Sequence, residues 1–420
     1  MAGTADELSS SSATSSHLLS LMSMSPTTIT SPYAPFFRDL NADERGLFLI
    51  HLLLNCATHV AAGNIAQANT FLEHISLLSS PDGDTMQRIA SYFTEALAAR
   101  LLRSWPGLYR ALNPILPDTA AASNHGRRLF LDLFPFLRLS FLISNQAIFR
   151  SDGRGESRPL SGRPEGPPHL RIITAVGEDR DFLTQTALVL TEEAEKLDIP
   201  FQFHAVVSQL DGLNIESLRV KTGEALAITS VLKLHTLLAT DEATATPRQL
   251  FSPIDKIESF LASLWGLSPK LMVVTEQESN HNGTNFNERF MEALNFYAAL
   301  TTAVCGAVEV EKLVFREEIK NIIACEGLER KERHEKLHKW MRRKELCSLF
   351  QLGDLEGECC GGIIARPSLV DCEKCRVMPA PNASGGQFGC VTIPNTLYWV
   401  KWRVWIGLWK HLTSARNNHS

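Results

Sequence analysis

The sequence predicts an α/β protein whose N-terminal third is helical and whose middle alternates strands with helices. Between Asp43 and Phe149, apolar residues recur every three or four positions, which is the spacing of amphipathic helices. After Pro168, short runs that are apolar on both faces alternate with helical stretches, which is typical of a parallel sheet covered by helices. The 420 residues are 44% hydrophobic, so the chain is long and apolar enough to bury a large core.

Three helices and a fourth, kinked one are expected in order along the N-terminal third. The first starts near Asp43 and stops at Gly63-Asn64, and the second stops at the loop Ser79–Asp84. Either Asp82 or Asp84 is expected to cap the third helix. The fourth runs from Arg127 to Phe149, with a kink predicted at Pro135.

The predicted sheet has four strands. They cover Leu170–Ala175, Ile199–Val207, Ala225–Leu232 and Leu271–Thr275. The predicted helices of this part cover Phe182–Leu197, Ile254–Trp265, Arg289–Ala303 and Val310–Trp340.

Charge and composition exclude several classes of protein. A formal charge of −5 argues against a protein that mainly grips nucleic-acid phosphates, because that role needs a basic surface. The sequence contains no run of 18 apolar residues and no signal-peptide pattern, so we expect neither a membrane span nor secretion. Without a secretory signal, the nine cysteines are expected to be reduced thiols.

The two ends differ from the middle in composition. Residues 1–32 hold ten serines and five threonines with few large apolar residues, so a disordered tail is expected over 1–40. From Cys347, glycines, cysteines and prolines cluster without periodicity, and four of the seven tryptophans fall between Trp399 and Trp409.

Several runs carry a family resemblance and occur in one order: Leu47–Leu54 with Gly63–Ala68, Ser79–Leu97, Arg163–Ile172, Glu192–Phe203, Trp265–Lys270, Val273–Glu278, Asn280–Gly283, Val310–Leu313, Glu317–Asn321, Glu326-Gly327 and Arg333–Glu335. They resemble the GRAS family of plant transcription regulators, within its scarecrow-like group and nearest to the scarecrow-like protein 3 subgroup. The resemblance implies a Rossmann- or methyltransferase-like α/β core with an N-terminal helical cap.

Two departures from the family pattern predict that this core is incomplete. The family's VHIID strand is missing between the helical cap and the Arg163-Pro164-Glu165-Gly166 run, and the C-terminal SAW region has no match. Losing an interior strand exposes unpaired backbone groups at the neighbouring edges. The expected domains are a helical cap at 41–150, an aberrant bridge at 151–162, an α/β core at 163–345 and a divergent tail at 346–420.

Three patterns suggest chemistry, and each has a plainer interpretation. His334-Glu335-Lys336-Leu337-His338 fits H-E-x-x-H, but its many charged neighbours indicate a solvated helix without a third ligand. Cys359-Cys360 with Cys372 and Cys375 would suit zinc, although the spacing is weak evidence. The tryptophans from Trp399 to Trp409 would share one helical face, which suits a membrane surface, a partner or a core. We therefore expect no metal, no cofactor and no catalytic residue.

The resemblance implies a nuclear, non-enzymatic transcription co-regulator that works through protein complexes in gibberellin-linked growth and development. The implied partners are other GRAS proteins, including DELLA-type repressors, and DNA-binding transcription factors, so nucleic acid is contacted only indirectly and no membrane is involved. Leu49, Leu52 and Leu53 form an L-x-x-L-L run that suits helix-in-groove docking. The same leucines would also serve as helical core.

Two other functions remain open at this point. The kinship of the core with methyltransferases suggests an enzyme that binds S-adenosylmethionine, but no G-x-G-x-x-G turn follows any predicted strand. The two departures suggest a truncated module that binds partners without regulating.

Overall fold

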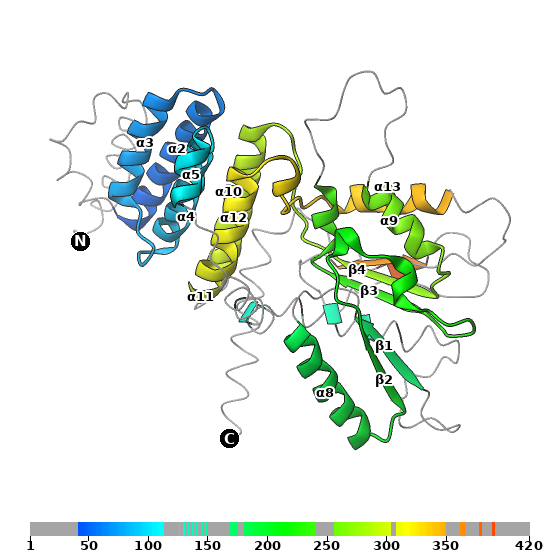
Figure 1. Ribbon diagram of the computed structural model, residues 1–420. Helices are drawn as coiled ribbons and strands as arrows, with labels where there is room; N and C mark the ends of the chain where they lie inside the picture. Colours follow the sequence, from blue (N-terminus) through cyan, green and yellow to red (C-terminus); the bar gives the residue numbers. More distant parts are fainter. Residues whose placement is uncertain are drawn as a thin grey trace, which may run out of the picture. The chain divides into compact units, whose positions relative to one another are not determined.

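The computed structural model describes residues 41–112, separate positions between 126 and 148, 169–174, 180–239, 256–303 and 308–349, together with three short strands in 362–390. The described residues fall into two compact units (Figure 1). The helical unit draws on 1–134 and 279–334, and the sheet unit on 135–278 and 335–401. Among these residues, no helix is long and apolar enough to cross a membrane.

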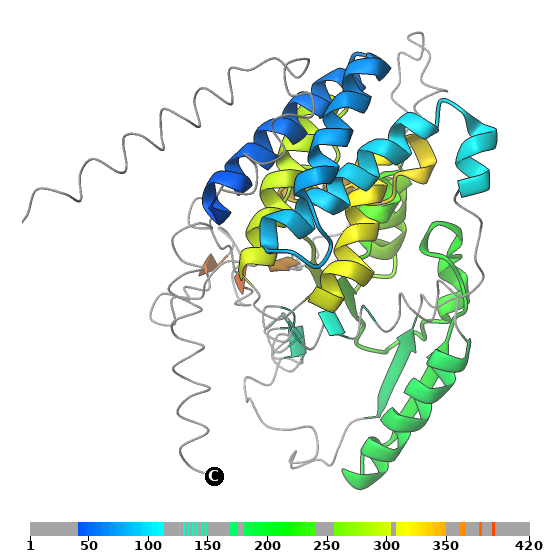
Figure 2. The same cartoon turned by 90° about the vertical axis from the view of Figure 1, so that its left-hand side faces the viewer.

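The helical unit combines helices from two distant stretches of sequence. From the N-terminal stretch come α2 (Ala42–Ala61), α3 (Ile65–Leu78), α4 (Thr85–Leu102) and α5 (Pro106–Leu112). From the later stretch come α10 (Phe286–Ala303), α11 (Val308–Val310), the π-helical turn η7 (Glu311–Phe315), α12 (Arg316–Ala324) and the turn η8 (Gly327–Glu329). Figure 2 shows the blue and cyan N-terminal helices alongside the yellow later ones.

Side-chain caps fix where α2 and α4 begin. Asn41 accepts a hydrogen bond from the Glu44 backbone N–H, and the Glu44 carboxylate accepts one in return from the Asn41 N–H. Asp84 and Gln87 form the same reciprocal pair at α4. Of the two predicted caps, Asp84 is the one used, since it lies directly before Thr85.

Helix α4 packs against α12 as well as against its neighbours α2 and α3. Phe93 and Phe290 meet edge to face, with ring centroids 5.3 Å apart, and both side chains are fully buried. Residues 286–324 lie within the α/β core predicted at 163–345, whereas their contacts group them with the helical unit. The apolar faces of α10 and α12 predict that these helices pack against other elements, but they do not predict to which unit the helices belong.

The sheet unit contains two small parallel sheets instead of one continuous sheet among its described residues. In the first, β1 (Leu170–Thr174) pairs with β2 (Phe201–Ala205). In the second, β4 (Leu271–Thr275) lies between β3 (Ala227–Val231) and β5 (Gly362–Ala365). The first four strands lie within the four predicted ranges.

Helices and one hairpin complete the sheet unit. They are α8 (Arg180–Lys196), the 3-10 turns η4 (Leu210–Gly212), η5 (Ile215–Leu218) and η6 (Leu234–Leu238), α9 (Lys256–Trp265), α13 (Leu337–Leu349), and the antiparallel pair β6 (Met378–Pro379) and β7 (Gly389–Cys390). A core of leucines from η6 and α9, with Met272 of β4 and Trp340 of α13, covers the β3–β4 sheet.

The predicted single helix over Val310–Trp340 is wrong. Helix α12 ends at Ala324, and the chain is non-helical between η8 and Leu337, where α13 begins. Gly327 adopts a φ of 56°, a left-handed conformation that favours glycine. In this stretch Arg330 donates a hydrogen bond to the backbone carbonyl of His281, and Arg333 donates one to that of Gly327.

Several expectations concern residues that the structure does not describe. These are the disordered tail over 1–40, the bridge over 151–162, the Pro135 kink, the four cysteines of the weak zinc pattern and the tryptophans of the tail. Of the divergent tail, the structure describes only the end of α13 and strands β5 to β7.

Candidate partner-binding site

The predicted contact residues Leu49, Leu52 and Leu53 lie in the core of the helical unit. Their exposed fractions are 0%, 2% and 0%. They project from α2 beside other buried side chains such as Phe48 and Cys56, which is the placement that the core interpretation requires. A partner would reach them only if α2 moved, so their role as contacts stays a prediction.

The charged run Arg330–Glu335 is buried and not solvated, contrary to expectation. Arg330, Arg333, His334 and Glu335 are each 2% exposed or less. Charged side chains are rarely buried to this degree unless they are paired. Their partners therefore decide what the segment does.

Within the helical unit, the carboxylate of Glu326 accepts contacts from three arginines. Its Oε1 lies 2.5 Å from Arg289 Nη2 and 2.8 Å from Arg100 Nη1, while its Oε2 lies 3.3 Å from Arg330 Nε. One carboxylate thereby joins α4, α10 and the loop after α12. We call these four side chains the Glu326 hub.

The environment of the hub shifts its pKa values. Burial raises the pKa of Glu326, but Arg289 and Arg100 outweigh that effect and hold the pKa below its ordinary value. Burial lowers the pKa of Arg289, against the opposing pull of Glu326. The hub is thus an ionised network at neutral pH.

Backbone carbonyls accept further hydrogen bonds from arginines of the hub. Arg289 donates to the carbonyl oxygens of Ile322 and Gly283, and Arg330 donates to that of His281. Arg333, just beyond the hub, donates to the Gly327 carbonyl and to Asn282 Oδ1. These bonds give the loops around α12 a fixed conformation.

A second buried ion pair joins α4 to the π-helical turn η7. Arg88 binds the carboxylate of Glu311 through two nitrogens, at 2.8 and 3.0 Å, and the Glu311 side chain is 1% exposed. Burial, with a further contribution from Glu311, raises the pKa of the neighbouring Tyr92 to about 12. This pair therefore links two segments of distant sequence in the core of the helical unit.

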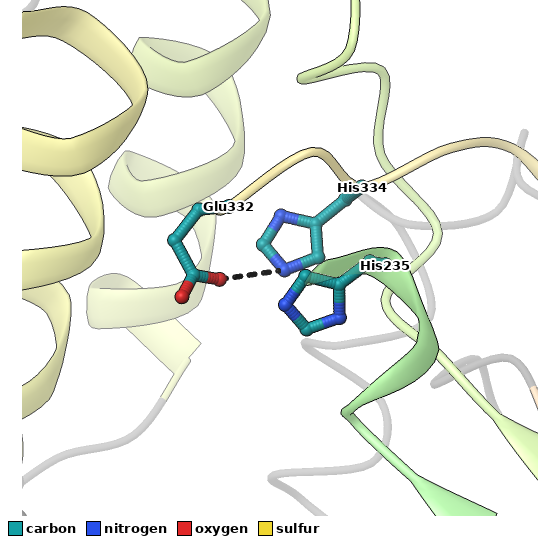
Figure 3. A group of neighbouring side chains, drawn as sticks. All are labelled: His235, Glu332 and His334. Carbon is teal, nitrogen blue, oxygen red and sulfur yellow. Dashed lines mark ion pairs between the residues drawn. The ribbon is translucent and has the colours of Figure 1, made fainter. Parts of the chain in front are cut away.

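Two histidines of the helical unit, His281 and His334, form a buried pair. The Nδ1 atoms of His281 and His334 lie 2.9 Å apart, and His334 Nε2 lies 3.3 Å from a carboxylate oxygen of Glu332 (Figure 3). A hydrogen bond between two Nδ1 atoms uses one proton, so one ring donates and the other accepts. The pair pins the loop at His281 to the segment at His334.

The H-E-x-x-H interpretation lacks the helix that it requires. That motif places both histidines on one helical face, but residues 334–336 are not helical. His334 is fully buried, while His338 is exposed. The local backbone does not form a zincin site here.

In the sheet unit, polar side chains gather where β3 and β4 end. Glu276 follows β4, and its carboxylate accepts backbone N–H groups from Lys233 and Leu234 and contacts His235 Nδ1 at 2.7 Å. Both His235 and Glu276 are at most 4% exposed. The pair ties the two strand ends together, and sequence reasoning missed it because its members lie 41 residues apart.

Comparison with known proteins identifies the family. The model of the GRAS domain family matches residues 49–154 and 158–353. The chain is 47% identical to Scarecrow-like protein 3 of Arabidopsis thaliana, over 78% of this chain and 84% of that protein. It is 38% identical to GRAS family protein TF80 of Medicago truncatula, over 77% of this chain and 88% of that protein.

More distant relatives and one solved structure agree with this assignment. The DELLA protein RGL1 of Arabidopsis thaliana is 31% identical over 72% of this chain and 60% of its own length. The crystal structure of SCL7 from Oryza sativa matches at a TM-score of 0.56 with 24% identity, covering 71% of this chain and 84% of that one, and so supports the fold alone. The scarecrow-like and DELLA relatives are plant transcriptional regulators of development and gibberellin signalling. The chain belongs to the GRAS domain family.

Proposed function

We propose that this chain is a transcription co-regulator that acts through protein complexes in gibberellin-linked plant development. The observation that carries the proposal is the 47% identity to Scarecrow-like protein 3 over 84% of that protein. The architecture of the helical unit supports it, because two sequence segments joined by buried ion pairs make a rigid body. A rigid body can present a fixed surface to partners.

The proposed partners are other GRAS proteins, including DELLA-type repressors, and DNA-binding transcription factors, with the nucleus as the place of action. DELLA proteins stand among the relatives of the chain, which supports a shared regulatory role. The net charge of −5 supports indirect contact with DNA, since phosphate binding needs a basic surface.

We propose further that the sheet unit is a methyltransferase-like core that has lost an interior strand. The two separate sheets support this, because a strand between them would complete one parallel sheet. The alignment with Scarecrow-like protein 3 spans 408 positions yet covers 78% of this 420-residue chain, so it includes positions that have no residue here. The VHIID region, missing from the sequence, would supply such a strand.

A partner assay combined with a reporter assay tests the function. The purified full chain should capture a DELLA protein, and its expression in plant protoplasts should change the output of a gibberellin-responsive promoter. A chain that captures partners without changing the reporter would be the truncated module. A folded chain that does neither would contradict the proposal.

The enzyme alternative has its own readout. A chain that binds S-adenosylmethionine should retain it through purification or bind it in calorimetry. Saturable binding would revive the methyltransferase interpretation. The regulatory names of the relatives and the missing glycine-rich turn favour the co-regulator.

A further inference from the structure

Strands β1 and β3 each have one edge without a partner strand. Among the residues that the structure describes, β1 pairs with β2 alone and β3 with β4 alone (Figure 1). Both pairs are parallel. An edge without a neighbouring strand presents a row of backbone N–H and C=O groups, and such a row can bind another extended chain.

The hydrogen bonds on the occupied edges show which residues face the open ones. Successive residues of a strand direct their backbone N–H and C=O groups to opposite neighbours. The Leu170 N–H donates to the carbonyl of Pro200, next to β2, so Leu170 faces β2. The Leu226 carbonyl accepts from the N–H of Lys270, next to β4, so Leu226 faces β4. The alternate residues face the open edges, and they are Arg171 and Ile173 of β1 with Ala227, Thr229 and Val231 of β3.

An ion pair relates the open edge of β1 to that of β3. Arg171 of β1 binds the carboxylate of Glu224, three residues before β3, at 2.9 Å, and it donates to the Arg219 carbonyl at 3.0 Å. The amino-terminal ends of β1 and β3 therefore lie at the same end of the sheet unit, as they would in one parallel sheet. Long side chains make this link, whereas β1 and β3 belong to separate hydrogen-bonded sheets.

The two faces of the β3–β4 sheet predict an occupant that is apolar on both sides. Met272 and Ile228 pack in the leucine core on one face, and Val273 packs with Ala227 on the other. Thr229, in the middle of β3, is exposed, although its partner in the ladder, Val273, is 2% exposed. A strand that continues this sheet beyond β3 would thus meet apolar neighbours on each face.

We propose that the two open edges bind an extended, apolar segment of a partner protein, which pairs with β1 on one side and with β3 on the other. The segment runs parallel to both strands and spans five residues, the length of each. Its alternate residues bond to β1 and to β3. This inference rests on the proposal that the sheet unit has lost an interior strand, and it adds that a partner supplies one.

Fluorescence anisotropy with a labelled probe peptide tests this pairing. The probe holds about seven valines and isoleucines, which favour strands, between pairs of lysines that keep it soluble. Two control probes carry N-methyl groups on alternate central residues, in the two possible phases. Each control lacks the N–H donors toward one neighbour but keeps every side chain and charge. The full-length chain should bind the unmethylated probe saturably and each control about tenfold more weakly, because hydrogen bonds are lost.

Variants of the chain locate the bound probe. Thr229→Pro removes an N–H that faces the open edge, where proline breaks no bond of the β3–β4 ladder. It should weaken probe binding about tenfold, whereas Thr229→Val, which keeps the N–H, should leave binding within about twofold. The bound probe should also slow hydrogen exchange of the backbone amides in β1 and β3, and it should leave exchange in α4 unchanged.

Three outcomes would overturn the pairing. These are no saturable binding of the probe, undiminished binding of either methylated control, or undiminished binding by Thr229→Pro. If inserting the missing segment into the chain protects β1 and β3 while the probe does not bind, the lost strand stands and only its supply by a partner fails. Capture of a DELLA protein with an altered reporter, in the absence of probe binding, would likewise leave the co-regulator function intact.

Discussion

Charged side chains tie the helical unit together across long stretches of sequence, whereas the sheet unit depends on ladders between short strands. Among the residues that the structure describes, six ion pairs join residues 82–103 to residues 311–329: Asp82–Lys312, Arg88–Glu311, Glu95–Arg316, Glu95–Lys320, Arg100–Glu326 and Arg103–Glu329. In the sheet unit, each of the four strands from β1 to β4 is five residues long, and they are divided between two sheets.

The difference predicts that the helical unit would tolerate the loss of a segment better than the sheet unit. A helix satisfies its backbone hydrogen bonds within itself, so it needs neighbours only for its side chains. A strand needs a neighbour for its backbone as well, and an edge without one leaves N–H and C=O groups unpaired. We therefore expect the helical unit to be the more stable of the two.

Supplying the interior strand that we propose is missing should have the largest effect. Inserting the VHIID segment of Scarecrow-like protein 3 between Phe149 and Arg163 should stabilise the sheet unit by about 5 kcal/mol, because several unpaired backbone groups each cost about 1–3 kcal/mol. The protection of the backbone amides of β1 to β4 against hydrogen exchange measures this stabilisation. Unchanged protection in these strands would show that the missing segment is not what limits the sheet unit.

Removing a core ring should have the next largest effect, and only on the helical unit. Phe93→Ala deletes the contact with Phe290 and should cost about 3–5 kcal/mol. Urea unfolding followed by helical circular dichroism measures the loss. Leu77→Ala, at 74% exposure on α3, is the control and should cost less than about 0.5 kcal/mol.

Breaking a buried ion pair should cost much more than breaking an exposed one. Glu311→Gln leaves Arg88 without its carboxylate in the core and should cost about 3 kcal/mol. Glu95→Gln breaks the exposed pair with Arg316 and should cost about 0–1 kcal/mol. Equal losses in urea unfolding would show that burial does not set the value of these pairs.

Acid should weaken the helical unit through Glu326, with the smallest effect of the series. The pKa of Glu326 is lower in the folded protein than its ordinary value. Its stabilising contribution is therefore complete above the ordinary glutamate pKa of about 4.3 and is lost as the pH falls through the lower folded value. The unfolding free energy of Glu326→Gln should fall less steeply below that pH, and parallel curves would contradict this.

The sequence by itself determined the local elements. Strands β1 to β4 lie inside their predicted ranges, and the third helix begins at one of the two predicted caps. These features depend on residues close together in the chain, where side-chain period and capping chemistry act. The family could also be recognised from the sequence, because the runs that resemble its motifs occur in the family's order.

The tertiary structure alone decided which elements share a unit and which charges are buried. The periodicity of the sequence predicts an apolar face on α10 and on α12, but it does not predict which helix covers that face. The sequence therefore predicts residues 286–324 only as part of the α/β core at 163–345. The run Arg330–Glu335 resembles a solvated helix in sequence, yet most of it is buried, where Glu326 and the backbone carbonyl of His281 supply partners for Arg330. Such partners lie up to 49 residues away, beyond the reach of any local pattern.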